Sequence, residues 1–320
     1  MLRNRLFVGV ISCCLACGGD DGPESGGDPT MDTAAGEIGV VDVTARGLTL
    51  EAPSEIPAGW TTFRFTNASP MIHLVVIERM PEGRGVQAQQ EEVAPVFQEG
   101  MDLLIAGDVD GAMAAFGELP AWFGEIVFFG GPGLTSPGRT SQSTVYLEPG
   151  TYLIECYVKT DGVFHSYNPD PAVYGMVHEI RVTGEVSDAV EPMADVTVTV
   201  SAEGGIVMEG DLSPGPQTVR VQFLDQVVHE NFLGHDVHVV RLFEDLDLAA
   251  LDLWMDWSQP SGLETPAPAT FIGGLNELPA GETGYFSVTL EPGEYALISE
   301  VSGAMGKGLF RAFTVDSVVE

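Results

Sequence analysis

The sequence is short of positively charged residues. It has 13 Lys and Arg against 47 Asp and Glu, a formal net charge of −34 over 320 residues. Such a surface repels phosphate, which excludes a general nucleic-acid binder and disfavours electrostatic docking on anionic lipid. The chain is not disordered overall, because 44% of it is hydrophobic and its length is enough for two domains with their own cores.

Long apolar runs are also missing. Leu6–Ala16 is apolar but too short to span a bilayer, and it follows the basic residues Arg3 and Arg5, which is typical of a signal peptide. The end of this run resembles a bacterial lipobox, with Cys17 as the lipidated residue, and Cys13 is a second candidate. An ordinary cleaved signal is the alternative. In either case we expect export, and the resemblance implies a lipid anchor in the bacterial cell envelope, on the periplasmic or outer-membrane side.

Residues 18–37 are rich in Gly, Asp and Pro and lack large apolar side chains apart from Met31. They cannot bury enough apolar surface to fold. The sequence therefore predicts a signal peptide over residues 1–17 and a flexible tether over residues 18–37.

The rest of the chain is an internal repeat. Leu147–Cys156 (LEPGTYLIEC) recurs as Leu290–Ser299 (LEPGEYALIS), and His73–Ile77 (HLVVI) matches His238–Leu242 (HVVRL). The pairs Gly130-Gly131 and Gly273-Gly274 also correspond. We predict two copies of one domain, the first at 38–185 and the second at 194–316, joined by a linker at 186–193.

Each copy reads as short strands of alternating apolar and polar residues, separated by Pro-Gly and Asn turns. This period of two predicts an all-β fold of two β-sandwiches in tandem. Residues 87–119 break the pattern, since the apolar side chains of Val93, Phe97, Met101 and Leu104 have helical spacing. We predict a helical insertion there in the first copy, with a shorter equivalent near 246–257 in the second.

Cysteines are few, and three of the four lie within the first 17 residues. Cys156 is therefore without a disulfide partner in the exported chain, where unpaired thiols are uncommon. A buried, inert core cysteine is one interpretation. The other is a metal ligand, because His73, His165 and Met176 complete the set of two imidazoles, one thiolate and one thioether that binds copper in type 1 sites.

The order His73, Cys156, His165, Met176 resembles the cupredoxin family, and the Cys-x8-His spacing is similar to that of the type 1 copper domain of copper nitrite reductases. The resemblance implies Greek-key sandwiches and one copper ion held by these four residues. Met176 lies further from His165 than is usual in that family, so His178 is a second candidate for the axial ligand. The second copy has Ser299 in place of the cysteine and is expected to be degenerate, with a structural or docking role, although His238 remains.

No hydrolase, nucleotide-binding or zinc-protease motif is present in a usable context. With six histidines in the chain, too few remain for a second, catalytic copper centre. We therefore expect a non-enzymatic protein that transfers single electrons to or from a redox protein partner, or that carries copper. The alternative is a metal-free surface lipoprotein whose sandwiches bind a protein or a glycan.

Overall fold

The computed structural model describes residues 39–170 and 172–317. The predicted signal peptide, the tether and Cys17 lie outside the described residues. The strands of the first copy are β1 (Val40–Arg46), β2 (Thr49–Glu51), β3 (Glu55–Asn67), β4 (Val76–Arg79), β5 (Val127–Phe128), β6 (Thr140–Leu147), β7 (Gly150–Glu155), β8 (Lys159–Thr160), β9 (Val163–Phe164) and β10 (Val177–Val186).

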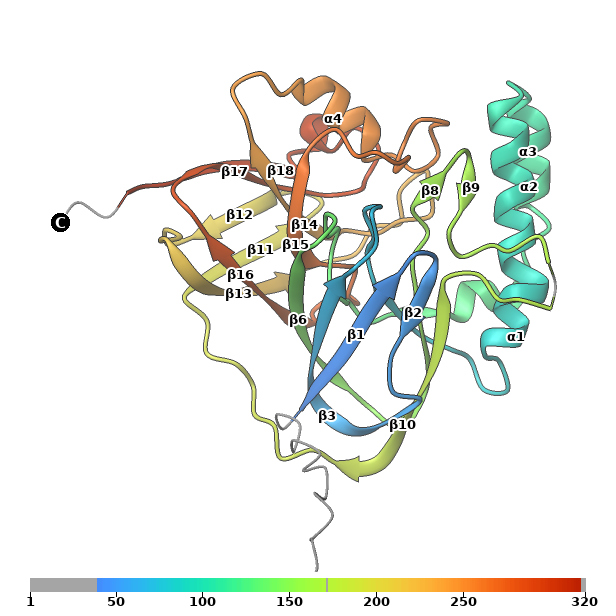
Figure 1. The fold of residues 1–320 in the computed structure, drawn as a ribbon, viewed down its shortest axis with the longest axis horizontal. Helices are drawn as coiled ribbons and strands as arrows, with labels where there is room; N and C mark the ends of the chain where they lie inside the picture. Colours follow the sequence, from blue (N-terminus) through green and yellow to red (C-terminus); the bar gives the residue numbers. More distant parts are fainter. Residues whose placement is uncertain (1–38, 171, 318–320) are drawn as a thin grey trace, which may run out of the picture. The chain divides into compact units, whose positions relative to one another are not determined.

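The second copy repeats the pairing order of the first. Its strands are β11 (Val196–Ser201), β12 (Gly205–Glu209), β13 (Gly215–Phe223), β14 (Val237–Leu242), β15 (Thr270–Leu275), β16 (Thr283–Leu290), β17 (Gly293–Ile298) and β18 (Phe310–Val315). β1 pairs with β2 and β3 as β11 pairs with β12 and β13, and the central strand β7 lies between β4 and β10 as β17 lies between β14 and β18. The predicted all-β fold of two β-sandwiches in tandem is confirmed (Figure 1).

Alternation of side chains builds the core of each sandwich. Buried and half-buried residues alternate along β11. They also alternate along β3 from Trp60 onward, where Phe63 and Phe65 are buried. A strand places successive side chains on opposite faces, so the period of two in the sequence becomes one apolar face per sheet. The predicted domain boundaries stay predictions.

The two copies share a sheet, which the sequence does not indicate. β6 of the first copy pairs antiparallel with β16 of the second, Ser143 opposite Phe286, so the layer β2-β1-β3-β6 continues into β16-β13-β11-β12. The glycine pairs also meet at this junction. A Cβ atom on Gly131 would lie 2.0 Å from the Val75 carbonyl oxygen, and one on Gly274 would lie 2.1 Å from that of Val237. Only glycine allows the backbone at these two positions to approach the neighbouring chain so closely.

The predicted insertion is helical. It comprises α1 (Val86–Ala88), the π-helix η1 (Gln89–Val93), α2 (Ala94–Ile105), α3 (Val109–Phe116) and the 3₁₀ helix η2 (Ala121–Glu125). α2 and α3 lie side by side next to β9, with Gly107 at positive φ between them (Figure 1). In the second copy, α4 (Leu248–Trp254) occupies the predicted shorter segment, and η3 (Ala304–Lys307) precedes β18.

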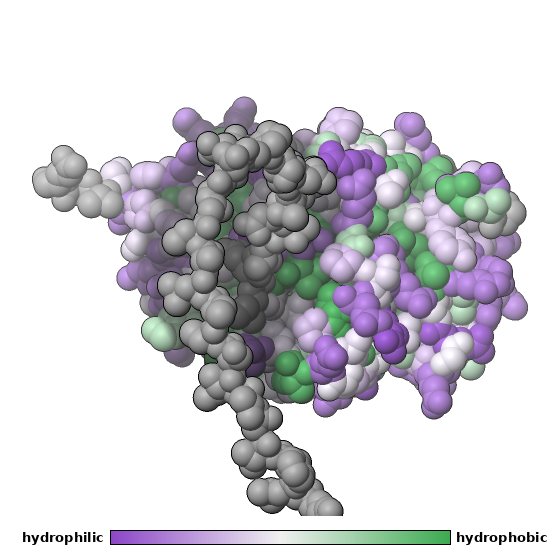
Figure 2. All heavy atoms as spheres, turned by 60° about the horizontal axis from the view of Figure 1, so that its bottom comes forward, coloured by the Kyte–Doolittle hydropathy of each residue, from purple (hydrophilic) through white to green (hydrophobic). Residues whose placement is uncertain are grey.

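The face shown in Figure 2 mixes hydrophilic residues with scattered hydrophobic ones. This is the pattern of an ordinary solvated surface. Within residues 39–170 and 172–317, no helix combines the length and the apolar character needed to cross a bilayer.

Candidate metal centre

The candidate ligands of the first copy come from strand ends, as their order in the sequence predicts. Cys156 directly follows β7, His165 directly follows β9, and Met176 directly precedes β10. His73 forms an isolated bridge with Thr135 shortly before β4. Because β7 pairs with both β4 and β10, these four positions meet at one end of the sandwich.

The structure brings three of the four side chains into a tight cluster. His73 Nδ1 lies 3.4 Å from Cys156 Sγ, His165 Nδ1 lies 3.7 Å from the same sulfur, and the two Nδ1 atoms are 3.1 Å apart. The point equidistant from these atoms lies about 2.0 Å from each of them, close to the bond lengths of about 2.0–2.3 Å that zinc makes with imidazole and thiolate ligands. A single metal ion therefore fits between the three atoms.

The cluster is closed to solvent. His73 and Cys156 are fully buried and His165 is 2% exposed. Burial lowers the pKa of His73 to about 4, and burial together with the neighbouring His73 lowers the pKa of His165 to about 3. Both imidazoles are thus neutral, the form that ligates a metal. Burial raises the pKa of the Cys156 thiol to about 12, so that a nearby cation is needed to hold it as the thiolate.

The ring of His165 is oriented by its other nitrogen. Nε2 lies 2.8 Å from Thr160 Oγ1, which lies in turn 2.8 Å from Thr265 Oγ1 and 3.3 Å from Met71 Sδ. When Nε2 carries the proton and donates it to Thr160, the lone pair of Nδ1 points into the cluster. Such a partner on the outer nitrogen fixes the tautomer of a metal-ligating histidine.

Replacing Thr160 with valine should weaken copper binding about 10- to 100-fold, because the ring of His165 loses the group that holds its tautomer. Competition with a chelator of known copper affinity measures this change. Thr66→Val is the matched control, since Thr66 makes a similar contact with Thr140, 3.1 Å between hydroxyl oxygens, on the strand pair β3–β6. Equal affinities for the two variants would contradict the role of Thr160.

Met176 is buried and joins the two ligand segments through its backbone. Its N–H donates to the His165 carbonyl at 2.6 Å, and its carbonyl accepts from the Cys156 N–H at 3.1 Å. Its thioether as an axial ligand stays a prediction. His178 lies on β10, opposite Ile154 of β7. It does not belong to the cluster of His73, Cys156 and His165, whose ligand atoms lie within 4.8 Å of one another.

The second copy has a different cluster at the corresponding place. His238 Nε2 lies 2.8 Å from Asp236 and 3.3 Å from Glu300, and Asp236 also accepts from Ser299 Oγ at 2.5 Å. The backbone N–H of Leu134 donates to His238 Nδ1 at 3.0 Å, so the ring proton is on Nε2. A metal bound at Nε2 would require the ring proton to be on Nδ1. There it would face the Leu134 N–H, and two hydrogen-bond donors would oppose each other. The cluster is therefore a buried hydrogen-bond network around a neutral His238 ring.

The sequence interpretation missed Glu300 of this network, and also a buried acidic residue next to the thiol of the first copy, Glu155. A signal for them was present. Glu155 follows the apolar pair Leu153-Ile154, and Glu300 lies two residues after the apolar pair Leu297-Ile298. A charged residue so close to a buried strand end is unexpected unless it has a buried partner.

No protein-family profile matches the sequence, and no curated protein matches it either. Solved structures give weak likenesses. Auracyanin B is 22% identical, with 40% of this chain and 94% of that chain covered and a TM-score of 0.29. Auracyanin A, a blue copper protein from Chloroflexus aurantiacus, is 23% identical over 45% of this chain and 98% of its own, with a TM-score of 0.26. A multicopper oxidase is 12% identical over 87% and 88%, with a TM-score of 0.21.

Proposed function

We propose that the first copy holds one copper ion in a type 1 site and that the protein carries single electrons. His73, Cys156 and His165 are the equatorial ligands and Met176 is the axial one. The observation that supports this is the triangle of two Nδ1 atoms and one Sγ atom, with sides of 3.1, 3.4 and 3.7 Å. Bound copper supplies a centre that takes up and releases one electron.

The donor set favours copper over zinc. Structural zinc sites are closed by four protein ligands, whereas this cluster offers three nitrogen and sulfur donors in a triangle. Two imidazoles and one thiolate in a trigonal arrangement with a long thioether are the set that blue-copper centres use.

The burial of the cluster favours electron transfer over copper delivery. A carrier must release its ion to a partner, which requires an accessible ligand, and here the most exposed of the three, His165, is 2% exposed. The backbone bonds that link Met176 to Cys156 and to His165 fix the segment between β7 and β10. A rigid site changes little when the charge of the ion changes, which suits an electron carrier.

A route leads from the cluster to the surface. Thr160, which contacts His165 Nε2, also contacts Met71 and Thr265, and both of these line a groove that includes Pro70. We place the docking of the redox partner at this groove. The non-enzymatic character belongs to the proposal as well, because His238 of the second copy is committed to Asp236.

The proposal is tested by loading the metal-free protein with Cu²⁺ and titrating it with a reductant of known potential. We expect one copper per chain and the uptake of one electron per copper, with the visible absorption bleached in proportion. Binding of zinc in preference to copper, or copper that takes up no electron, would contradict the proposal.

The proposal includes export and a lipid anchor on Cys17. Cys17→Ser should move the protein from the membrane fraction to the soluble fraction of the cell envelope, because a lipidated residue one is the anchor that the sequence predicts. Fractionation and immunoblotting measure this. Cys13→Ser is the matched control and should stay with the membrane. Retention of the Cys17 variant in the membrane would contradict the anchor.

A further inference from the structure

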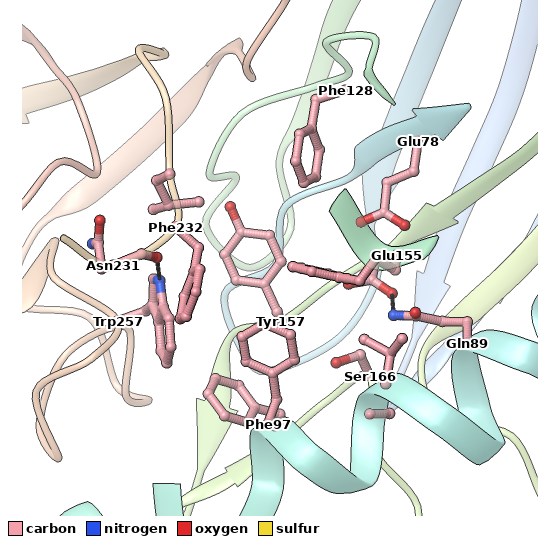
Figure 3. Close-up of a pocket in the computed structure, with 15 residues that line it drawn as sticks. Glu78, Gln89, Phe97, Phe128, Glu155, Tyr157, Ser166, Asn231, Phe232 and Trp257 are labelled. Atoms are coloured by element: carbon pink, nitrogen blue, oxygen red, sulfur yellow. Dashed lines mark hydrogen bonds between the residues drawn. The ribbon is translucent and has the colours of Figure 1, made fainter. Parts of the chain in front are cut away.

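A cavity of about 70 Å³ lies between the helical insertion of the first copy and two segments of the second copy. Seven of its fifteen lining residues are aromatic, among them Phe97 of α2, Tyr157, Phe232 and Trp257. Figure 3 shows these rings grouped on one side and the acidic residues Glu78 and Glu155 on the other.

The cavity shares its backbone with the candidate copper ligands. Glu155 and Tyr157, on either side of Cys156, both line it, and so do Phe164 and Ser166, on either side of the second histidine ligand. Successive side chains of an extended segment point to opposite sides. Each of these two segments therefore turns one residue toward the metal cluster and its two neighbours toward the cavity.

The polar part of the wall includes oxygen atoms that accept no hydrogen bond. Glu78 and Glu155 lie on the neighbouring strands β4 and β7 and are 4% and 6% exposed. Gln89 Nε2 donates to Glu155 at 2.7 Å, which leaves Glu78 Oε2 and Gln89 Oε1 as buried oxygens without a hydrogen-bond partner. Leaving such buried atoms unpaired is unfavourable, so a ligand that donates hydrogen bonds is favoured here.

The residues of the wall favour a cation as this partner. No Lys, Arg or His is among the described residues that line the cavity, while two carboxyl groups are. Aromatic rings such as those of Phe97 and Trp257 bind apolar groups and, through their faces, organic cations. Phe232 is 39% exposed and holds a positive φ of 67°, so the wall reaches solvent at a strained residue. Strain of this kind concentrates at ligand sites.

We propose that this cavity binds a small primary ammonium ion that carries a short apolar group. Its N–H groups donate to Glu78 Oε2 and Gln89 Oε1, and its apolar group packs against Phe97 and Trp257. This site goes beyond the proposed electron transfer and does not depend on copper.

Calorimetric titration of the metal-free protein with n-butylammonium tests the proposal. We expect saturable binding of one ion per chain. 1-Butanol, which is similar in size but neutral, and tetramethylammonium, which is cationic but has no N–H group, should each bind about tenfold more weakly or worse, because a hydrogen bond to a charged group is lost. Equal affinity for either compound, or no binding of n-butylammonium, would overturn the proposal.

Glu78→Gln should weaken n-butylammonium binding about tenfold or more while keeping the size of the side chain. Glu118→Gln, at an exposed position beyond α3, is the matched control and should bind like the wild type. The comparison of the three compounds on the wild type keeps the test decisive if the Glu78 variant does not fold. Cys156→Ser should retain n-butylammonium binding, which separates the failure of this site from the failure of the copper site. Unchanged binding by a folded Glu78 variant would overturn the proposal.

Discussion

Replacing Cys156 with serine should abolish the intense visible absorption of the copper-loaded protein. That absorption comes from charge transfer between a thiolate sulfur and Cu²⁺, and Cys156 is the thiol that lies 3.4 and 3.7 Å from the two imidazole nitrogens. It is also the free cysteine that the structure records within residues 39–170 and 172–317. A serine oxygen is a harder donor and supplies no such band. Visible absorption and electron paramagnetic resonance of samples loaded with one equivalent of Cu²⁺ measure the effect.

Two further variants show whether the loss is specific. His165→Asn should also remove the band, whereas His178→Asn should leave it unchanged, because His178 lies outside the cluster. Far-ultraviolet circular dichroism establishes that each variant is folded. An intense band that survives in the serine variant, or one that disappears only in the His178 variant, would contradict the assignment of the ligands.

Asp236→Asn should destabilise the protein by about 1–3 kcal/mol, the cost of leaving a buried hydrogen-bonding group without its partner. Asp236 accepts from His238 at 2.8 Å, from Ser299 Oγ at 2.5 Å and from the backbone N–H of Glu300 at 2.9 Å. Its side chain therefore links the start of β14 to the end of β17. The metal cluster of the first copy lies at the corresponding place. Urea unfolding followed by circular dichroism measures the free energy. Asp211→Asn, at an exposed position, is the control and should change it by less than about 0.5 kcal/mol.

The fold was predictable because its signals are local. Alternation in segments such as β3 and β11 identifies strands, and helical spacing from Val93 to Leu104 identifies the insertion. The repeat itself assigned the same arrangement of strands to both copies. The pairing of β6 with β16 could not be predicted, because edge strands that join across copies obey no spacing rule in the sequence.

The candidate site was predictable from residue type and order, while its surroundings were not. An unpaired cysteine with histidines before and after it points to a metal whatever the fold. Thr160, by contrast, acts on His165 through a single hydroxyl contact, and Glu78 meets Glu155 only because β4 pairs with β7. Such contacts depend on tertiary packing, and isolated threonines and glutamates are too common in a sequence to indicate them.

The most direct test of the copper site is a crystal of the copper-loaded protein, measured at the copper absorption edge. The account predicts one anomalous peak per chain, about 2.0–2.3 Å from His73 Nδ1, Cys156 Sγ and His165 Nδ1. A peak at Asp236, His238 and Glu300 instead, or no peak near the three ligand atoms in a loaded crystal, would contradict it.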